Sequence, residues 1–259
     1  MKSNATIAEV LFVLAASMAA VCAPRTAAAQ PATTRCAACH FANMSDVPSP
    51  ERLADWQRSA HARHVVGCHE CHGGDPWAVV PRDAHRGVVA AGQRSSPVNA
   101  ANVVSTCRRC HEANARAFER STHRAPSARD GEAAPTCTTC HGTMRAAVPS
   151  PAALEARCAA CHPADSARGE YPALMRAGAE ALSALRARID ALDDAVARVP
   201  EHGRRVELLV ALHNAREIVA ASIAAIHTFD VQQVNERLAI ARREVDALAA
   251  ATSTAATDR

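Results

Sequence analysis

The chain has 259 residues, with 29 Lys or Arg against 26 Asp or Glu, so its formal net charge is only +3. A charge this small and dispersed does not favour nucleic-acid binding. No run of about 18 uncharged apolar residues is present, because Glu9 interrupts the one candidate, and a transmembrane helix is not expected. Aromatic residues make up only 3% of the chain, whereas 11 residues are Cys and 13 are His. With so few large rings for a core, this composition indicates a metal or cofactor protein.

The N-terminus has the order of a secretory signal peptide. Lys2 precedes an apolar stretch, and small residues follow it up to Ala29. We therefore expect residues 1–29 to be a signal peptide, cleaved near Ala29, that sends the mature chain to the periplasm. A lipoprotein anchor at Cys22 is disfavoured, because Val21 occupies a position where a small residue is usual. Removal of this segment leaves ten cysteines in an oxidising compartment.

All ten of these cysteines belong to C-x-x-C-H motifs, and this motif is the attachment signal of c-type haem. The two thiols form thioether bonds to the haem, and the adjacent His is the proximal ligand of the iron. The sequence therefore predicts five covalently bound haems c. The expected covalent anchors are Cys36, Cys39, Cys68, Cys71, Cys107, Cys110, Cys137, Cys140, Cys158 and Cys161. The expected proximal ligands are His40, His72, His111, His141 and His162.

Other uses of paired cysteines explain the pattern less well. Disulfides would leave the five following histidines without a role. Zinc sites group Cys and His in fours, and thioredoxin-like motifs occur singly, near a βαβ unit. Five haems within residues 36–162 would leave about 25 residues for each, so the macrocycles should replace the missing aromatic core. Neighbouring irons should then lie close enough for direct electron transfer.

An aromatic-x-x-Ser-x-His sequence precedes the second motif and again the fourth, and a glycine follows each of these two motifs. The first copy runs from Trp56 to His61 and the second from Phe118 to His123. With these motifs, residues 33–165 resemble the multihaem c-type cytochrome superfamily, in particular its cytochrome c-554-like and cytochrome c3-like electron carriers and its decahaem conduit cytochromes. The resemblance implies that His61 and His123 are distal ligands of bis-histidine irons. The alternative for each is exposure to solvent or a hydrogen bond to a propionate.

Five irons need five distal ligands, and several further side chains compete for the remaining places. His85 lies in a polar turn, His64 lies close to the first Ser-x-His histidine, and His69 lies inside its own C-x-x-C loop. Met44 and Met144 could also be axial ligands, although methionine more often fills gaps in a core. The candidate distal ligands are His61, His123, His85, His227, His213 and His64.

From Pro172 onward the composition shifts to Ala, Leu, Arg and Glu, and apolar residues recur at alternating spacings of three and four, which predicts helices. The three series are Leu182, Leu185, Ile189, Leu192, Val196 and Val199; Leu209, Leu212, Arg216 (the one exception), Val219, Ile223 and Ile226; and Val231, Val234, Leu238, Ala241, Val245 and Leu248. Asp230 and Gln233 predict a capping box at the start of the third helix. We expect residues 171–251 to form a three-helix antiparallel bundle and residues 252–259 to be a disordered tail.

His213 and His227 flank the apolar seam of the second predicted helix, on the same side of it. One or both could leave the edge of the bundle to ligate a haem and so dock the two parts of the chain. His227 is favoured, because Phe229 beside it could pack on a ring. Helical tails of this kind resemble those of larger pentahaem and octahaem reductases. The alternative is an exposed or hydrogen-bonded helix histidine.

These features predict a mainly α protein with much irregular loop, in which a pentahaem cytochrome c domain over residues 30–170 precedes the bundle. The expected function is electron transfer along closely spaced bis-histidine haems between periplasmic or membrane-associated redox partners, without a catalytic residue. The alternative is a multihaem reductase of small nitrogen or sulfur oxyanions with one open haem site. The lack of a C-x-x-C-Lys motif and the single tyrosine, Tyr171, count against it. A docking subunit that forms a homo-oligomer through its helical tail is a third interpretation.

Overall fold

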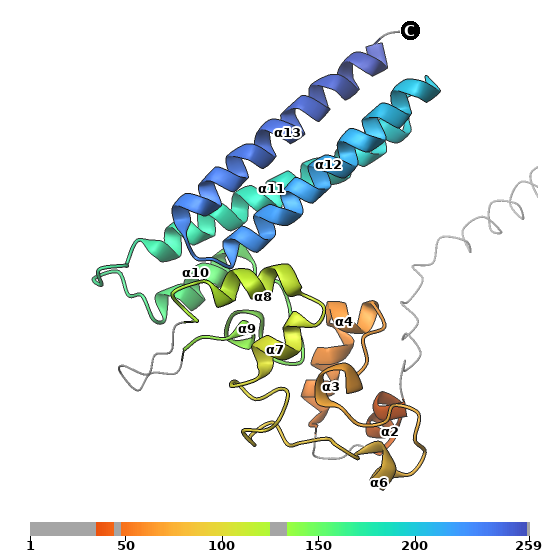
Figure 1. Ribbon diagram of the computed structural model, residues 1–259, viewed down its shortest axis with the longest axis vertical. Helices are drawn as coiled ribbons and strands as arrows, with labels where there is room; N and C mark the ends of the chain where they lie inside the picture. The colour runs from red at the N-terminus through yellow and green to blue at the C-terminus, as the bar shows by residue number, and fades with distance from the viewer. Residues whose placement is uncertain (1–34, 44–47, 125–133, 258–259) are drawn as a thin grey trace, which may run out of the picture.

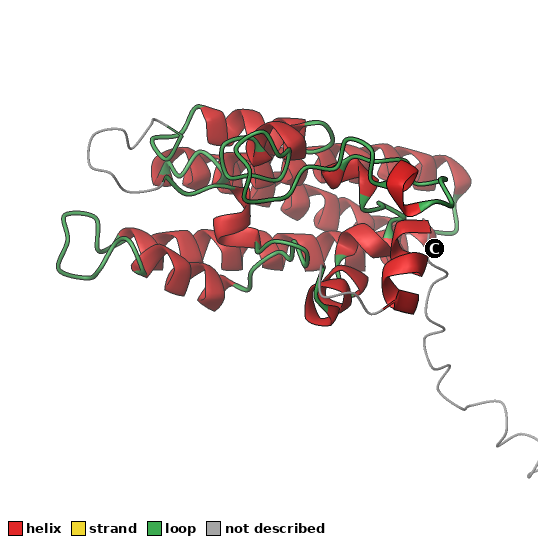
Figure 2. Cartoon of the chain, turned by 90° about the horizontal axis from the view of Figure 1, so that it is seen from below, coloured by secondary structure: helices red, strands yellow, loops and turns green. Residues whose placement is uncertain are grey.

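The structure is a computed structural model that describes residues 35–43, 48–124 and 134–257. Within these ranges the chain is mainly α-helical and has no strand, as the sequence predicts (Figure 2). The predicted signal peptide lies outside the described residues. Figure 1 shows two parts, a region of short helices joined by loops and a group of three long helices that extends away from it.

The first part is built from short helices only. They are α2 (Arg35–Asn43), α3 (Pro50–Gln57), α4 (Ala60–Arg63), α5 (His69–His72), α6 (Pro81–Ala84), α7 (Val103–Arg108), α8 (Glu112–Glu119), α9 (Cys137–His141) and α10 (Pro151–Ala159). Proline occupies the first turn of α3, α6 and α10, where the missing N–H is not needed. Helices this short are not stable alone in water, so their stability must come from contacts outside each helix.

Few large side chains are buried in this first part. Its one described hydrophobic cluster consists of Val104, Ala115 and Phe118, against which Cys137 and Phe229 pack. Several large apolar side chains are instead more than half exposed, namely Val65, Trp77, Val79 and Val148. Side-chain burial therefore contributes little to the stability of this region.

The second part consists of α11 (Tyr171–Ala197), α12 (His202–Ile226) and α13 (Val231–Thr257), which we call the helical module. Each of these helices packs against the other two, around one shared hydrophobic core. The predicted apolar series of α11 and α13 lie buried or half-buried in this core, with the exception of Val231 at the start of α13. The periodicity of the sequence thus located both helices and the faces that they bury.

The predicted apolar series of α12 is confirmed except at Leu209, since Leu212 and Val219 are buried in the core and Ile223 and Ile226 are half-buried against it. The buried residues of α12 are Leu208, Leu212, Ala215, Val219, Ser222 and Ala225. Leu209, which the predicted series included, is 46% exposed. Arg216 does not interrupt the seam but lies beside it, where its guanidinium pairs with the Asp193 carboxylate of α11 at 2.8 Å. Because α12 is apolar on more than one side, spacing alone did not distinguish the buried Leu208 from the exposed Leu209.

Side-chain caps define the ends of the long helices. The Asp230 carboxylate accepts a hydrogen bond from the backbone N–H of Gln233 at 3.0 Å, which is one half of the predicted capping box of α13. The backbone N–H of Asp230 donates to the Thr228 hydroxyl at 3.2 Å, instead of to the side chain of Gln233 as the box requires. Helix α13 continues to Thr257, whereas the sequence predicted a disordered tail over residues 252–259. Residues 258–259 lie outside the described residues. The reason is that Thr252 is buried and that Ala251 and Ala255 pack against the shared core of the three helices.

By length and composition alone, α12 is apolar enough to cross a membrane, with a mean hydropathy of 1.4, and it is the one such helix among the described residues. From the sequence, the N-terminal stretch was the one candidate for a membrane-spanning helix. In the structure one face of α12 packs on α11 and α13, while Val206, Leu209 and Val210 are exposed on its surface.

The two parts of the chain are in direct contact. Helix α10 packs on α11, and a salt bridge of 3.0 Å joins Glu155 of α10 to Arg176 of α11. The loop between α12 and α13 lies against the short helices, where the ring of Phe229 meets that of Phe118 with centroids 6.3 Å apart. Phe229 has a φ of 55°, an unusual backbone conformation for a bulky residue. This loop is where the helical module reaches the candidate site.

Candidate functional site

Each C-x-x-C-H motif forms about one turn of helix. The second motif contributes α5 and the fourth is α9, while the third and fifth begin in the last turns of α7 and α10. The backbone N–H of the motif histidine bonds to the carbonyl of the first cysteine, as from His72 to Cys68 at 2.9 Å. Residues three and four apart on a helical turn share a face, so both thiols and the imidazole of a motif lie on one side of the chain.

Four of the five motif histidines face a histidine from elsewhere in the chain. The ring-centroid separations are 5.8 Å for His40 and His85, and 6.0 Å for each of the pairs His61 and His111, His123 and His162, and His141 and His227. Every pair joins one predicted proximal ligand to one candidate distal ligand. The structure therefore brings together eight residues that the sequence analysis had selected separately.

The uniform separation fits two imidazoles on opposite sides of one metal ion. A metal–nitrogen bond is about 2 Å long and the nitrogen lies about 1 Å from the ring centroid, so opposed rings should be about 6 Å apart. The angles between the ring planes nevertheless range from 14° to 86°. Rotation about a metal–nitrogen axis leaves the centroid separation unchanged, whereas in direct ring packing the distance and the angle vary together. The four pairs show a constant distance with a variable angle.

Hydrogen bonds set the tautomer of three of these histidines. In each, Nδ1 lies within hydrogen-bond distance of a backbone carbonyl, which can only accept, so Nδ1 carries the proton and Nε2 keeps a lone pair for a metal. The bonds run from His85 to Pro81 at 2.7 Å, from His141 to Ala147 at 3.0 Å and from His227 to Ile223 at 2.9 Å. In a fourth, His123, Nδ1 is buried without a hydrogen-bond partner.

Burial lowers the pKa of one histidine in each pair, and the partner imidazole lowers it further, because two cationic rings would repel each other. These histidines are His40, His61, His123 and His227. At His227 the hydrogen bond to the Ile223 carbonyl opposes this effect. The neutral ring, which is the metal-binding form, is therefore favoured at these positions.

The sequence repeat is also a structural repeat. Ser59 and Ser121 are buried, with 1% and 7% exposure, and their hydroxyls donate to the carbonyls of Trp56 at 2.6 Å and Phe118 at 2.7 Å. Each bond closes the turn that follows a short helix and leads to the Ser-x-His histidine. The glycine after the second and the fourth motif has a φ of 77° in both copies. This local geometry explains why an aromatic, a serine and a histidine recur at a fixed spacing.

The thiols of successive motifs are neighbours. They lie close enough to affect each other's pKa, although burial is the largest cause of the raised values at Cys68, Cys71 and Cys158. The neighbouring thiols are Cys36 and Cys68, Cys71 and Cys107, Cys107 and Cys137, which share a hydrogen bond, and Cys140 and Cys158. The five motifs therefore follow one another in space in the same order as in the sequence.

Neither rival use of the cysteines has support in the described part of the chain. Among the described residues, none of the ten motif cysteines forms a disulfide. Among the described residues, no group of three or more Cys, His, Asp or Glu side chains converges as a zinc site would require. In each motif, two thiols and an imidazole lie along one side of the chain instead.

A hollow beside the fifth motif has the composition of a haem site. Its lining includes the motif residues Cys158 and His162 and the facing His123. The opposite wall comes from the helical module, through Tyr171, Met175 and the ring of Phe229, whose centroid lies 4.4 Å from that of His123. A motif thiol, two facing imidazoles and a mainly apolar lining, to which Thr122 and Arg168 add polar groups, are a donor set consistent with haem.

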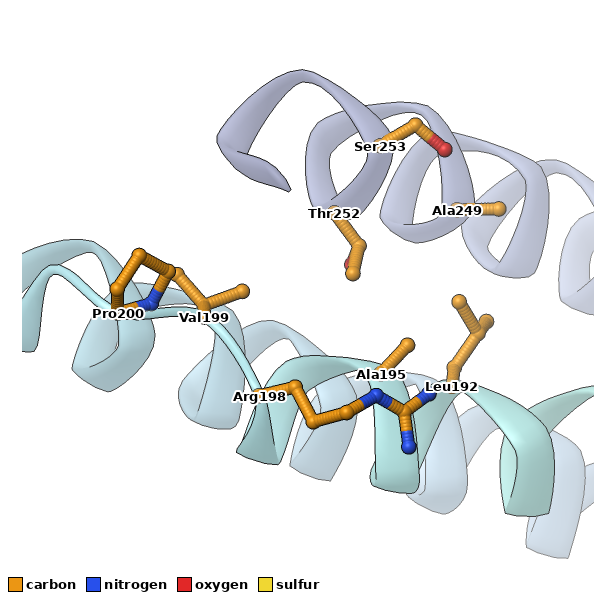
Figure 3. A pocket seen from close by; sticks show the side chains of 8 residues that line it. All are labelled: Leu192, Ala195, Arg198, Val199, Pro200, Ala249, Thr252 and Ser253. Atoms are coloured by element: carbon orange, nitrogen blue, oxygen red, sulfur yellow. The ribbon is translucent and has the colours of Figure 1, made fainter. Parts of the chain in front are cut away.

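Another hollow lies at the far end of the helical module. Figure 3 shows it between α11 and α13, with Leu192 and Ala195 on one side and Ala249 and Thr252 on the other. Neither cysteine nor histidine is among its lining residues. It is therefore not part of the candidate site.

The remaining candidate ligands take no part in the pairs. His64 and His213 are exposed, and no ring contact involves either of them. His69 has Nε2 at 3.1 Å from the Glu70 carboxylate, while its Nδ1 is buried without a partner. Met44 lies outside the described residues, and Met144 is half-buried in the loop after α9.

Sequence reasoning missed the contribution of Tyr171 and Met175 to the hollow beside the fifth motif. A signal was present, since Met175 and Gly178 extend the apolar series of α11 backwards from Leu182 at the same spacing, and both are buried.

A scan of protein-family models, a search of curated proteins and a search of solved structures each find no match to this chain. The candidate site thus rests on its motifs and its geometry.

Proposed function

We propose that the mature chain is a periplasmic pentahaem c-type cytochrome that transfers electrons between redox proteins. The observation that carries this proposal is the pairing of four motif histidines with four non-motif histidines at 5.8–6.0 Å. The resemblance of residues 33–165 to the multihaem cytochrome superfamily supports the same conclusion. In this proposal a haem-packed domain is followed by a three-helix antiparallel bundle.

Each residue of the site then has a defined role. The two cysteines of a motif hold one haem and the motif histidine is its proximal ligand. The proposed distal ligands are His85 opposite His40, His61 opposite His111, His123 opposite His162, and His227 opposite His141. A bound haem supplies a one-electron redox centre. The hydrogen bonds from Nδ1 of His85, His141 and His227 to backbone carbonyls would limit the movement of these ligands when an iron changes oxidation state, which favours fast electron transfer.

The order of the motifs supports a continuous route. Because the thiols of successive motifs are neighbours, the haems attached to them would be neighbours as well. Electrons could then enter near the first motif and leave near the fifth, or pass in the reverse direction. The helical module closes the fifth site through Phe229 and reaches the fourth through His227.

The proposal is tested on protein exported from cells that attach haem c. Intact mass and haem absorbance should show five haems per chain, and the oxidised protein should give mainly low-spin ferric signals in electron paramagnetic resonance (EPR). Every haem should be reduced by an external donor and reoxidised by an acceptor. Fewer than five covalent haems, or a protein isolated with disulfides or zinc in place of haem, would contradict the proposal.

A matched pair of variants tests the ligand roles. His123→Ala should convert one haem from low-spin to high-spin, because it removes the ring opposite His162. His213→Ala, which changes an exposed histidine on α12, should leave the spectrum unchanged. Identical spectra for both variants would show that His123 is not a distal ligand.

A further inference from the structure

His72 differs from the other four motif histidines. All 13 histidines of the chain lie within the described residues, and eight of them form the four pairs. His72 is half-buried and makes no ring contact with any other histidine. The second motif is thus the one whose histidine has no imidazole opposite it.

The remaining histidines are held elsewhere. His64 is exposed at the end of α4, and His213 is exposed on α12. The His69 ring contacts the Glu70 carboxylate, and His202 lies 3.3 Å from the guanidinium of Arg205. None of these four rings is placed to oppose His72.

Lysine cannot replace histidine as a ligand in the mature chain. The only lysine in the sequence is Lys2, which belongs to the predicted signal peptide. Met175, the one fully buried methionine among the described residues, lines the hollow beside the fifth motif instead. A nitrogen ligand opposite His72 therefore has no source in the described chain.

The structural repeat explains why the second motif differs from the fourth. The two motifs are equivalent in the repeat, and each is followed by a glycine with a φ of 77°. His141 of the fourth motif is opposed by His227, which comes from the helical module. The chain has a single helical module, and it packs beside the second copy of the repeat, so no equivalent helix supplies a ring to His72.

We propose that the haem held by Cys68, Cys71 and His72 binds small exogenous ligands on the face opposite His72. The ligand class is diatomic: carbon monoxide and nitric oxide for the reduced iron and cyanide for the oxidised iron. This inference rests on the proposed attachment of five haems. The site lies between the first and third motifs, because Cys68 neighbours Cys36 and Cys71 neighbours Cys107. Electrons would reach it from either side.

The first experiment is a carbon monoxide titration of the fully reduced holoprotein. We expect one carbon monoxide bound per chain of five haems, and one high-spin ferric signal that disappears on addition of cyanide to the oxidised protein. Five attached haems with no bound carbon monoxide would overturn this inference and leave the proposed function standing. Fewer than five attached haems would instead contradict the proposed function.

Single removals of the proposed distal ligands then identify the open haem. In H85A, H61A, H123A and H227A the number of bound carbon monoxide molecules should rise from one to two per chain. H64A and H213A are the controls and should stay at one. One of these four variants could carry five haems and still bind only one carbon monoxide. The open site would then belong to the haem of that histidine pair, and the assignment to His72 would be wrong. If a variant fails to take up haem, the carbon monoxide titration of the wild-type protein still decides whether one haem has an open site.

Discussion

Two histidines of α12 show how strongly a single position affects the site. His227 lies at the end of the helix, where the carbonyl of Ile223 holds its Nδ1 at 2.9 Å and its ring faces that of His141. His213 lies on a similar side of the helix but about 20 Å further along its axis. Periodicity placed both residues on one side of α12. Only the packing of the loop between α12 and α13 against the short helices selected His227.

At the same scale, we predict that the two buried serines of the repeat support the distal histidines. Ser59→Ala and Ser121→Ala each remove a hydroxyl that donates to a backbone carbonyl, which should cost about 1–2 kcal/mol of stability. Each variant should also broaden the low-spin signal of the haem served by the following histidine. Thermal unfolding and EPR measure the two effects.

Ser150→Ala is the matched control for these serine variants. The Ser150 hydroxyl caps a helix by accepting a hydrogen bond of 3.2 Å from the backbone N–H of Ala153, but Ser150 is not part of a Ser-x-His sequence. It should lower the stability without changing any haem signal. Equal spectral changes in all three variants would contradict a specific role for the repeat.

At the scale of elements, the register of α12 gives a direct test of the packing. Leu212 is fully buried in the shared core, whereas Leu209 is 46% exposed. Leu212→Ala should therefore destabilise the protein by about 2–4 kcal/mol, and Leu209→Ala by less than about 1 kcal/mol. Chemical unfolding followed by circular dichroism measures both. Equal losses would show that Leu209 is buried, as the predicted series has it, and would contradict its exposure in the structure.

The cap of α12 predicts a dependence of stability on pH. Hydrogen bonds from the backbone N–H groups of Arg204 and Gly203 lower the pKa of the Glu201 carboxyl. The unfolded chain then binds this proton more readily than the folded one. The contribution of Glu201 to stability is thus fully present above its unfolded pKa and is lost as the pH falls through the folded pKa.

Substitution of the cap tests this dependence. Glu201→Gln should reduce the loss of thermal stability between neutral pH and mildly acidic pH, since the variant has no proton to bind at this position. Glu244→Gln, at an exposed position within α13 and away from its cap, is the control and should keep the wild-type pH profile. A wild-type profile in the Glu201 variant would show that the cap does not titrate with folding.

At the scale of the whole molecule, the region of short helices and the helical module depend on each other through the haem sites. The Cys140 thiol of the fourth motif neighbours that of Cys158 in the fifth, and both sites receive side chains from the loop between α12 and α13. A region with so little side-chain burial should fold only as its haems are attached.

We therefore predict that Cys140→Ala lowers both the number of attached haems and the thermal stability of the protein. Intact mass and a thermal unfolding curve measure the two quantities. Cys22→Ala, inside the predicted signal peptide, is the control and should give mature protein with five haems. A Cys140→Ala protein with five fully attached haems and normal stability would contradict the coupling of haem attachment to folding.

The sequence alone determined the features that depend on local spacing. The motifs located every predicted anchor and proximal ligand, and periods of three and four residues located the three long helices with the buried faces of α11 and α13. The identity of His61, His123, His85 and His227 as candidates also came from the sequence. Such signals survive in one dimension because a helical turn brings together residues that are close in the chain.

Only the tertiary structure decided which histidine faces which. His61 meets His111 and His123 meets His162, and in both cases another motif intervenes in the sequence. Three further features depend on contacts between distant segments: the lack of a ring opposite His72, the exposure of Leu209 and the continuation of α13 beyond residue 251. The physical reason is that such contacts are set by the packing of whole elements, which local spacing does not encode.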